Sequence, residues 1–204
     1  MEHITIDLLR INNFRNCEDL KLEWHPRFNV LTGRNGAGKT SVLDALYYMT
    51  NGKSYFSAQD KYLYRYHTDY FRLSADISNE DNTSMCEVVS SVQKKKTIRC
   101  DEKVLASITE YYGRFPAFMI APKDILILIE SSIERRRLID RTLSQVDRSY
   151  FINILRYNKL LKQRNAALKT FQKTKQVDSL LLDALDQEMD MPARYIADKR
   201  KHYI

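Results

Sequence analysis

The sequence predicts an α/β protein in which a lobe with a phosphate-binding loop and an antiparallel β subdomain precedes part of an α-helical lobe. Three observations support this class: alternating apolar residues near the N-terminus and in 70–104, clustered glycines at 33–38, and long helical periodicity after Pro122. We place the nucleotide-binding lobe, which we expect to be incomplete, at 1–121. The start of the helical lobe is placed at 122–204.

The first fifty residues predict two strands, a loop and a helix. Apolar residues at 4, 6 and 8 alternate with polar ones, and those at 20, 22 and 24 repeat the pattern, as in half-buried strands. Residues 28–32 (FNVLT) predict a short buried strand that ends at Gly33. From Lys39 onward apolar residues recur at helical spacing, and Asn51-Gly52 is a helix stop signal. The order is strand, glycine-rich loop, helix.

The rest of the chain predicts a strand meander and then helices. Residues 70–77, 84–92 and 95–100 have strand character and are separated by polar turns, and 115–120 predicts a further strand. Beyond Pro122 the apolar spacing becomes helical. The three helices expected there are 131–146, 149–174 and 178–203.

Composition indicates a packed cytoplasmic protein. Of the 204 residues 44% are hydrophobic, 29% charged and 11% aromatic, whereas disordered chains combine high charge with few aromatic residues. The sequence has neither a secretory signal pattern nor an apolar run of membrane-spanning length. Cys17, Cys86 and Cys100 are far apart in the sequence and lack metal-ligand spacing, so free thiols are expected rather than a metal site.

The segment from Gly33 to Thr40 (GRNGAGKT) satisfies the pattern GxxxxGK[ST]. Glycines in such a loop let backbone N–H groups approach phosphate oxygens, and the following helix N-terminus favours negative charge. Lys39 is expected to neutralise the β and γ phosphates, and Thr40 to coordinate Mg²⁺. The sequence therefore predicts a site for ATP and Mg²⁺. The candidate nucleotide-binding residues in this segment are Gly33, Arg34, Asn35, Gly36, Ala37, Gly38, Lys39, Thr40 and Ser41.

Hydrolysis also needs an acid that holds the metal, normally at the end of a second buried strand. The apolar run 125–129 ends in Glu130, but it follows Pro122 and precedes a basic helix, so we prefer a helix or connector to a metal-binding strand. Residues 143–147 (LSQVD) resemble an LSGGQ signature without its glycines. We therefore interpret them as a helix end.

Charge is segregated near the C-terminus. Residues 151–175 contain seven basic residues and no acidic one, and 176–190 contain five acidic residues and no basic one. The basic block is either a solvated helix face or a surface for a polyanion such as DNA. The arginines at 135–137 are equally compatible with DNA contact and with a cluster that packs between lobes or pairs with carboxylates. The basic residues in 151–175 are Arg156, Lys159, Lys162, Arg164, Lys169, Lys173 and Lys175.

Several motifs, in order along the chain, resemble those of the RecF family within the ABC-type group that also contains SMC proteins. The N-terminal motifs are NNFRN at 12–16 and FNVLTGRNGAGKT at 28–40. Others are NGKS at 51–54, PKD at 122–124, RRRLID at 135–140 and YNKLLKQRN at 157–165.

This resemblance implies an ABC-type ATPase head and a bacterial protein of DNA replication, recombination, repair and the SOS response. Such a protein binds ATP, dimerises around nucleotide, binds DNA at single-strand gaps and works with RecO and RecR to load RecA. By the same resemblance Arg15 would reach the nucleotide phosphates, and the turn at 122–124 would link the two lobes near the metal. The basic helix would contact DNA, with Arg156, Lys159, Lys162, Lys169 and Lys173 as candidates.

The resemblance also sets limits. Phe56 stands where arginine is common, which argues against a phosphate contact by residues 54–60. Glu130-Ser131-Ser132 replaces the usual Gly-Ser-Pro. In the family the signature motif and the metal-binding acid follow the helical lobe. We therefore expect a weak DNA-dependent ATPase in the full-length protein and negligible hydrolysis by this chain alone. The alternative class is a metabolic P-loop kinase, which would respond to a small acceptor instead of DNA.

Overall fold

The computed structural model describes residues 4–80, 82–124 and 132–203. The chain divides into two compact units, Met1–Ile120 and Ala121–Ile204. The apolar run 125–129 and Glu130, considered above as a metal-binding strand, lie outside the described residues.

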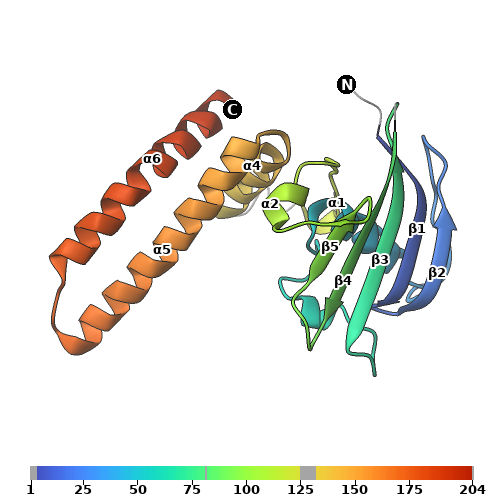
Figure 1. The fold of residues 1–204 in the computed structure, drawn as a ribbon, viewed down its shortest axis with the longest axis horizontal. Helices are drawn as coiled ribbons and strands as arrows, with labels where there is room; N and C mark the ends of the chain where they lie inside the picture. The colour runs from blue at the N-terminus through green and yellow to red at the C-terminus, as the bar shows by residue number, and fades with distance from the viewer. Residues whose placement is uncertain (1–3, 81, 125–131, 204) are drawn as a thin grey trace. The chain divides into compact units, whose positions relative to one another are not determined.

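The N-terminal unit is built on an antiparallel sheet of six strands in the order β2-β1-β3-β4-β5-β6 (Figure 1). The predicted N-terminal pair and the predicted meander are thus confirmed, and they share one sheet because β1 pairs with both β2 and β3. The strands are β1 (Thr5–Phe14), β2 (Cys17–Glu23), β3 (Tyr70–Ser78), β4 (Thr83–Ser91), β5 (Thr97–Cys100) and β6 (Lys103–Val104).

The predicted helix after the glycine loop is confirmed as α1 (Lys39–Asn51). It ends at Gly52, which has φ 66° and donates its N–H to Tyr48 O at 2.7 Å, so the Asn51-Gly52 stop signal works through a left-handed C-cap. Two shorter helices complete this unit. They are the 3₁₀ turn η1 (Asp60–Tyr62) and α2 (Ile108–Tyr111).

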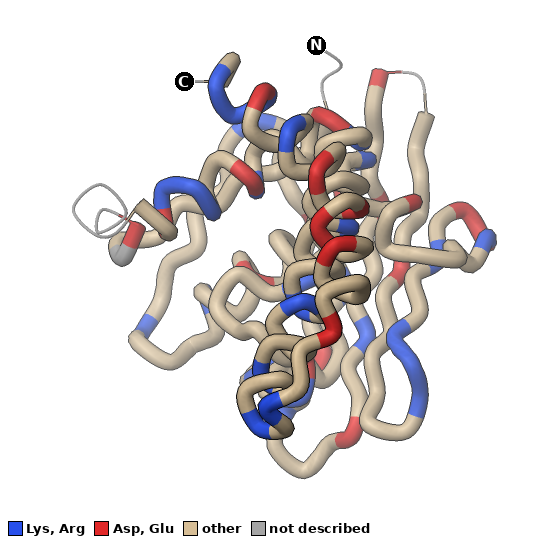
Figure 2. Tube along the Cα trace, turned by 90° about the vertical axis from the view of Figure 1, so that its left-hand side faces the viewer, with Lys and Arg blue, Asp and Glu red and all other residues tan. Residues whose placement is uncertain are grey.

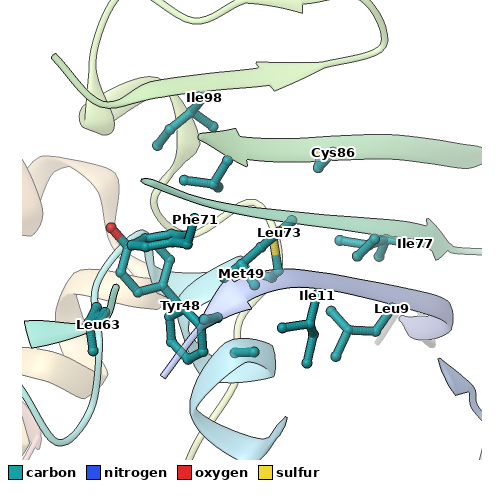
Figure 3. Packing of buried hydrophobic residues seen from close by; sticks show 14 of the residues in the cluster. Leu9, Ile11, Tyr48, Met49, Leu63, Phe71, Leu73, Ile77, Cys86 and Ile98 are labelled. Atoms are coloured by element: carbon teal, nitrogen blue, oxygen red, sulfur yellow. The ribbon is translucent and has the colours of Figure 1, made fainter. Parts of the chain in front are cut away.

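The core of the N-terminal unit lies between α1 and one face of the sheet (Figure 3). Leu9 and Ile11 from β1 are fully buried, because the alternation of the strand sends every second side chain inward. Tyr48 of α1 and Phe71 of β3 meet edge to face, with ring centroids 5.3 Å apart. Burying each such side chain contributes about 1.5–3 kcal/mol, which fixes α1 and the loop before it against the sheet.

Two predicted strands are wrong. Residues 28–32 form no strand, and Phe28 and Val30 are 86% and 83% exposed. Residues 115–120 are also irregular, and Phe118 is 60% exposed. Both runs have apolar composition, but a strand also needs a neighbouring strand to bond, and the described residues provide none for either segment.

The expectation of three free thiols is also wrong. Cys86 of β4 and Cys100 of β5 form a disulfide, and only Cys17 is free. The antiparallel register places the two bonded cysteines directly opposite each other, with Cα atoms 4.2 Å apart and both side chains in the core. Their separation in the sequence conceals this proximity. Burial raises the pKa of the Cys17 thiol.

The second unit contains a 3₁₀ turn and the three predicted helices. Leu143, Tyr150 and Ile196 form its small core. No helix in the described part of the chain combines the length and apolar composition needed to cross a bilayer. The elements are η2 (Pro122–Asp124), α4 (Ser132–Val146), α5 (Arg148–Thr174) and α6 (Ser179–Tyr203).

Asp147 connects the helices of the second unit. It caps α5 by accepting the Tyr150 N–H at 2.9 Å, and it accepts bonds from Tyr195 and Lys199 of α6. Burial by itself would raise the pKa of Asp147, but the hydrogen bonds from Lys199, Tyr150 N–H and Tyr195 hold it below its ordinary value. Near it, Arg200 forms a two-pronged pair with Asp140 at 2.8 Å.

Candidate nucleotide-binding site

The glycine-rich loop and the first turn of α1 form one side of a pocket of roughly 350 Å³. The turn between β1 and β2 forms the other side, through Arg15 and Asn16. The structure thus brings Arg15 together with most of the predicted loop residues, while Gly33, Arg34 and Ala37 do not line this pocket. The loop residues that line it are Asn35, Gly36, Gly38, Lys39, Thr40 and Ser41.

Gly38 shows why the loop needs glycine. It precedes α1 with φ 94°, a conformation that residues with a Cβ rarely adopt. A Cβ at this position would also lie 3.3 Å from Cys17 Sγ and 3.4 Å from the Asn16 side-chain amide. The absence of a side chain allows the β1–β2 turn to approach the loop and leaves the N-terminal amides of α1 beside the pocket.

Asn16 braces the loop, a role that the sequence analysis missed. Its Nδ2 donates to Gly36 O at 2.8 Å, and its Oδ1 accepts from Ser41 Oγ at 2.6 Å. One side chain therefore joins the loop to the first turn of α1. The available signal was its position immediately after Arg15 in the NNFRN motif.

Lys39 points back onto the loop. Its Nζ donates to the carbonyl oxygens of Gly33 and Arg34, both at 2.8 Å. Both acceptors are neutral, and no ion pair joins Lys39 to a carboxylate among the described residues, so the ammonium charge remains available for an anion. Thr40 is exposed at the pocket, where its hydroxyl can serve as a metal ligand.

Arg15 lines the pocket, yet its guanidinium group is held from behind. Its Nη2 lies 2.7 Å from a carboxylate oxygen of Asp44, a fully buried residue of α1. Asp44 also accepts from Ser54 Oγ at 2.7 Å and from Tyr55 N–H at 2.8 Å. Phe56 packs against the guanidinium, 5.4 Å from ring centroid to Arg15 Cζ. Phe56 thus supports the guanidinium of Arg15.

Arg15 Nε is buried without a hydrogen-bond partner within the described chain. Buried donors of this kind are rare, and this one belongs to a side chain that lines the pocket. An anionic ligand fits this environment. The described residues include no group of three or more His, Cys, Asp or Glu side chains placed to hold a metal ion.

The basic helix proves to be partly neutralised. Arg156 and Arg164 of α5 form ion pairs with Glu188 (3.7 Å) and Asp186 (2.6 Å) of α6. Acidic residues, drawn red, recur along α6 in Figure 2. The remaining candidates Lys159, Lys162, Lys169 and Lys173 are exposed and form no ion pair among the described residues. Lys175 is the C-cap of α5.

Other candidate segments have local roles. Arg136 and Arg137 of α4 bond to Ser132 and Glu134 of the same helix. Residues 143–146 are the last turn of α4, as predicted, and Asp147 follows them as the α5 cap. In the 122–124 turn, Asp124 accepts the Ala121 N–H at 2.5 Å.

A phosphate-binding loop opening a helix, an antiparallel sheet packed on that helix and a following set of helices define a mixed α/β ATPase head of the ABC type. Heads of SMC proteins share this fold. The chain superposes on the Smc head domain with an extended coiled coil from Pyrococcus furiosus with a TM-score of 0.54 at 17% identity, covering 98% of this chain and 59% of that one. At this identity the likeness concerns the fold alone.

Matches at the level of sequence identify the family, which the fold alone does not. Residues 8–201 match the family described as AAA domain, and the chain belongs to it. It is 32% identical over 199 residues to the DNA replication and repair protein RecF of Staphylococcus aureus strain JH9, covering 98% of this chain and 54% of that protein. The chain spans about half the length of the curated relatives it matches.

Solved structures agree with the sequence relatives. The recombination mediator protein RecF with ATP, of the RecFOR pathway, superposes with a TM-score of 0.91 at 27% identity, covering 100% of this chain and 55% of that one. The same mediator with ATPγS gives a TM-score of 0.92 at 28% identity, covering 99% and 54%. The predicted resemblance to RecF is thus confirmed, and the chain is a RecF-like ATPase head.

Proposed function

We propose that this chain binds ATP with Mg²⁺ at residues 33–41 and acts in DNA repair as part of a RecF-type protein. The observation that carries the proposal is the pocket at the start of α1. Lys39 and the glycine-rich loop line this pocket, and the backbone conformation of the loop at residue 38 favours glycine. A triphosphate would replace the loop carbonyls as the partner of the Lys39 ammonium. Arg15, whose Nε has no partner among the described residues, would bind a second phosphate oxygen.

Mg²⁺ would neutralise charge on the phosphates, with Thr40 Oγ1 as the protein ligand that we assign. Hydrolysis requires further groups that position water and complete the metal site. We infer that this chain alone hydrolyses ATP negligibly. We also infer that two copies of a RecF-type protein would form an ATP-dependent homodimer, with each nucleotide bound between the two heads.

Isothermal titration calorimetry with ATP and Mg²⁺ tests the nucleotide site. Lys39→Ala is expected to abolish binding, whereas Lys103→Ala, an exposed lysine of β6, should leave the affinity unchanged. Thr40→Ala should remove the dependence on Mg²⁺ while retaining weak binding of free ATP. An unchanged affinity in Lys39→Ala would refute the assignment.

We further propose that α5 contacts the phosphate backbone of DNA. The two arginines paired with α6 have less charge to offer than the exposed lysines of the same helix, so Lys159, Lys162, Lys169 and Lys173 are the contacts that we assign. By the RecF likeness the DNA would carry a single-strand gap, and the partners would be RecO and RecR in loading RecA. On the same likeness we propose a cytoplasmic location.

Paired charge reversals measured by fluorescence anisotropy test this surface. Replacing Lys162 and Lys169 with Glu should weaken duplex binding. It should also make the fall of log affinity with log salt less steep by about 2, since each phosphate contact contributes about 0.9 to that slope. Lys21 and Lys103, both exposed and outside α5, provide the matched double reversal. Equal slopes for the two variants would exclude α5 as the contact. Stimulation of full-length ATP turnover by a small acceptor instead of DNA would favour a kinase.

A further inference from the structure

The segment that follows Asp60 is rich in aromatic and basic residues. Its sequence is Lys61-Tyr62-Leu63-Tyr64-Arg65-Tyr66-His67. The structure separates these residues into an inner and an outer set. Leu63 is fully buried in the core and Tyr64 packs against it, whereas Tyr62 and Tyr66 are 68% and 82% exposed. Aromatic rings with this exposure contribute little to packing, and both lie on one basic segment of the surface.

The segment is held firmly by the rest of the N-terminal unit. Arg15 N–H donates to Leu63 O at 2.7 Å and Arg65 N–H donates to Asn13 O at 3.0 Å, which ties it to the β1–β2 turn. A tight turn follows, closed by the Thr68 N–H on Arg65 O at 3.0 Å. The exposed tyrosines therefore stand on an ordered backbone.

Tyr66 and His67 occupy the centre of that turn. Their rings are 4.0 Å apart between centroids. His67 has φ 64°, a left-handed conformation that is uncommon for a residue other than glycine. Residues in this conformation cluster at functional sites, and here the turn presents two neighbouring rings at the surface.

Both ends of the segment are tied to the turn between β4 and β5. Lys96 lies 3.3 Å from Asp60, and the Val92 N–H donates to Asp69 O at 2.8 Å. This turn also carries Lys94 and Lys95, which are exposed and form no ion pair within the described residues. The segment and the turn together form what we call the tyrosine surface. It consists of Lys61, Tyr62, Tyr66, His67, Lys94 and Lys95.

The acids near the tyrosine surface are largely paired. Glu18 pairs with Arg65 at 2.7 Å, and Asp60 pairs with Lys96. The Asp69 carboxylate accepts a long hydrogen bond, 3.5 Å from Gln93 Nε2. Lys61 lies over one face of the Tyr62 ring, with Nζ 4.9 Å from the centroid, so a positive charge is held next to this aromatic ring.

We propose that the tyrosine surface binds single-stranded DNA, with unpaired bases stacked on Tyr62 and Tyr66 and the backbone held by Lys61, Lys94 and Lys95. Aromatic rings beside lysines are the pattern by which proteins hold unpaired strands without reading sequence. A duplex hides the faces of its bases and would leave both rings unused. The inference rests on the proposed function in DNA repair, but it concerns a surface separate from the lysines of α5.

Fluorescence anisotropy of the full chain with a labelled oligothymidylate, and with a duplex of equal length, tests the proposal. Tyr62→Ala and Tyr66→Ala should each weaken oligothymidylate binding about fivefold or more, because stacking of one base contributes about 1–3 kcal/mol. Duplex affinity should not change. The matched variants Tyr62→Phe and Tyr66→Phe keep the ring and should keep the affinity. Neither tyrosine hydroxyl bonds to a described residue, so Ala leaves no buried polar group behind.

The lysines are tested by charge reversal. Lys94→Glu and Lys95→Glu should each lower the salt slope for oligothymidylate by about 0.7, the contribution of one phosphate of a single strand. Lys103→Glu, beyond the other end of β5, should leave the slope unchanged.

The outcomes are distinguishable. Binding of duplex without binding of oligothymidylate overturns this inference alone, and binding of neither DNA overturns the proposed function with it. Unchanged oligothymidylate affinity in both Ala variants excludes stacking on these rings. An equal loss for duplex and single strand would also overturn the inference, because it would indicate a general phosphate contact.

Discussion

Replacing Asp44 with Ala should strongly destabilise the N-terminal unit. The Asp44 carboxylate is fully buried and accepts from Arg15, Ser54 Oγ and the Tyr55 N–H at 2.7, 2.7 and 2.8 Å. Its loss would leave a guanidinium group, a hydroxyl and an amide without their acceptor. Breaking a buried ion pair on one side costs about 3–5 kcal/mol, and because the Arg15 side chain is 25% exposed we expect about 2–4 kcal/mol.

Urea unfolding followed by tryptophan fluorescence measures this loss. Trp24 is the only tryptophan of the chain and packs against the core of the N-terminal unit, so its signal reports on that unit. Asp76→Ala is the matched control, since Asp76 also pairs with an arginine, Arg10, but the two side chains are 26% and 41% exposed. The control should lose less than about 1 kcal/mol. Equal losses in the two variants would refute the reasoning.

A double-mutant cycle separates the ion pair from the other contacts of Asp44. Asp44→Asn keeps an acceptor for Ser54 and Tyr55 but removes the charge. Combined with Arg15→Ala, it should show a coupling free energy of about 1.5–3 kcal/mol, as for hydrogen bonds to charged groups. If Asp44 positions Arg15 for a phosphate, the two substitutions should also be non-additive in ATP affinity.

Three other predictions concern the core, the helical unit and the disulfide. Leu73→Ala removes a fully buried side chain and should lower the free energy of unfolding by about 2–5 kcal/mol in the Trp24 assay, and a loss below about 1 kcal/mol would contradict this packing. The lowered pKa of Asp147 means that its stabilisation is present above 3.8 and is lost as the pH falls through the native pKa. Asp147→Asn should therefore reduce the acid sensitivity of urea unfolding monitored by helical circular dichroism. Thiol titration of urea-unfolded chain without reductant should find one thiol, whereas three would exclude the bond between Cys86 and Cys100.

The features that could be predicted from the sequence depend on neighbours in the chain. Alternating apolar residues at 4, 6 and 8 and at 20, 22 and 24 predict β1 and β2, because the side-chain period of a strand is local. The loop at 33–40 is predicted for the same reason, since its glycines, lysine and threonine are consecutive. The wrong strands at 28–32 and 115–120 have suitable composition, but pairing depends on residues far away in the sequence.

The candidate site divides in the same way. Lys39 and Thr40 could be assigned from the motif alone. Asn16 and Asp44 could not, because their roles exist only when the β1–β2 turn meets the loop and when residues 54–55 fold onto α1. Asp44 in particular occupies a position in α1 that a sequence pattern would assign to solvent, and it is fully buried because Arg15 neutralises it.

Once a buried position of α5 is known, its basic residues can be separated into those that face α6 and those on the opposite face of the helix. Leu160 is a buried residue near the middle of α5, and Arg156 and Arg164 lie four residues to either side, on the face that α6 covers. At 3.6 residues per turn, Lys162, Lys169 and Lys173 lie about 180–220° around the helix from Leu160. Reversing Arg156 would therefore break a contact within the helical unit and would confuse lost stability with lost DNA affinity. Reversing the lysines on the opposite face changes the charge without removing an ion pair to α6, so they are the positions at which phosphate contact can be decided.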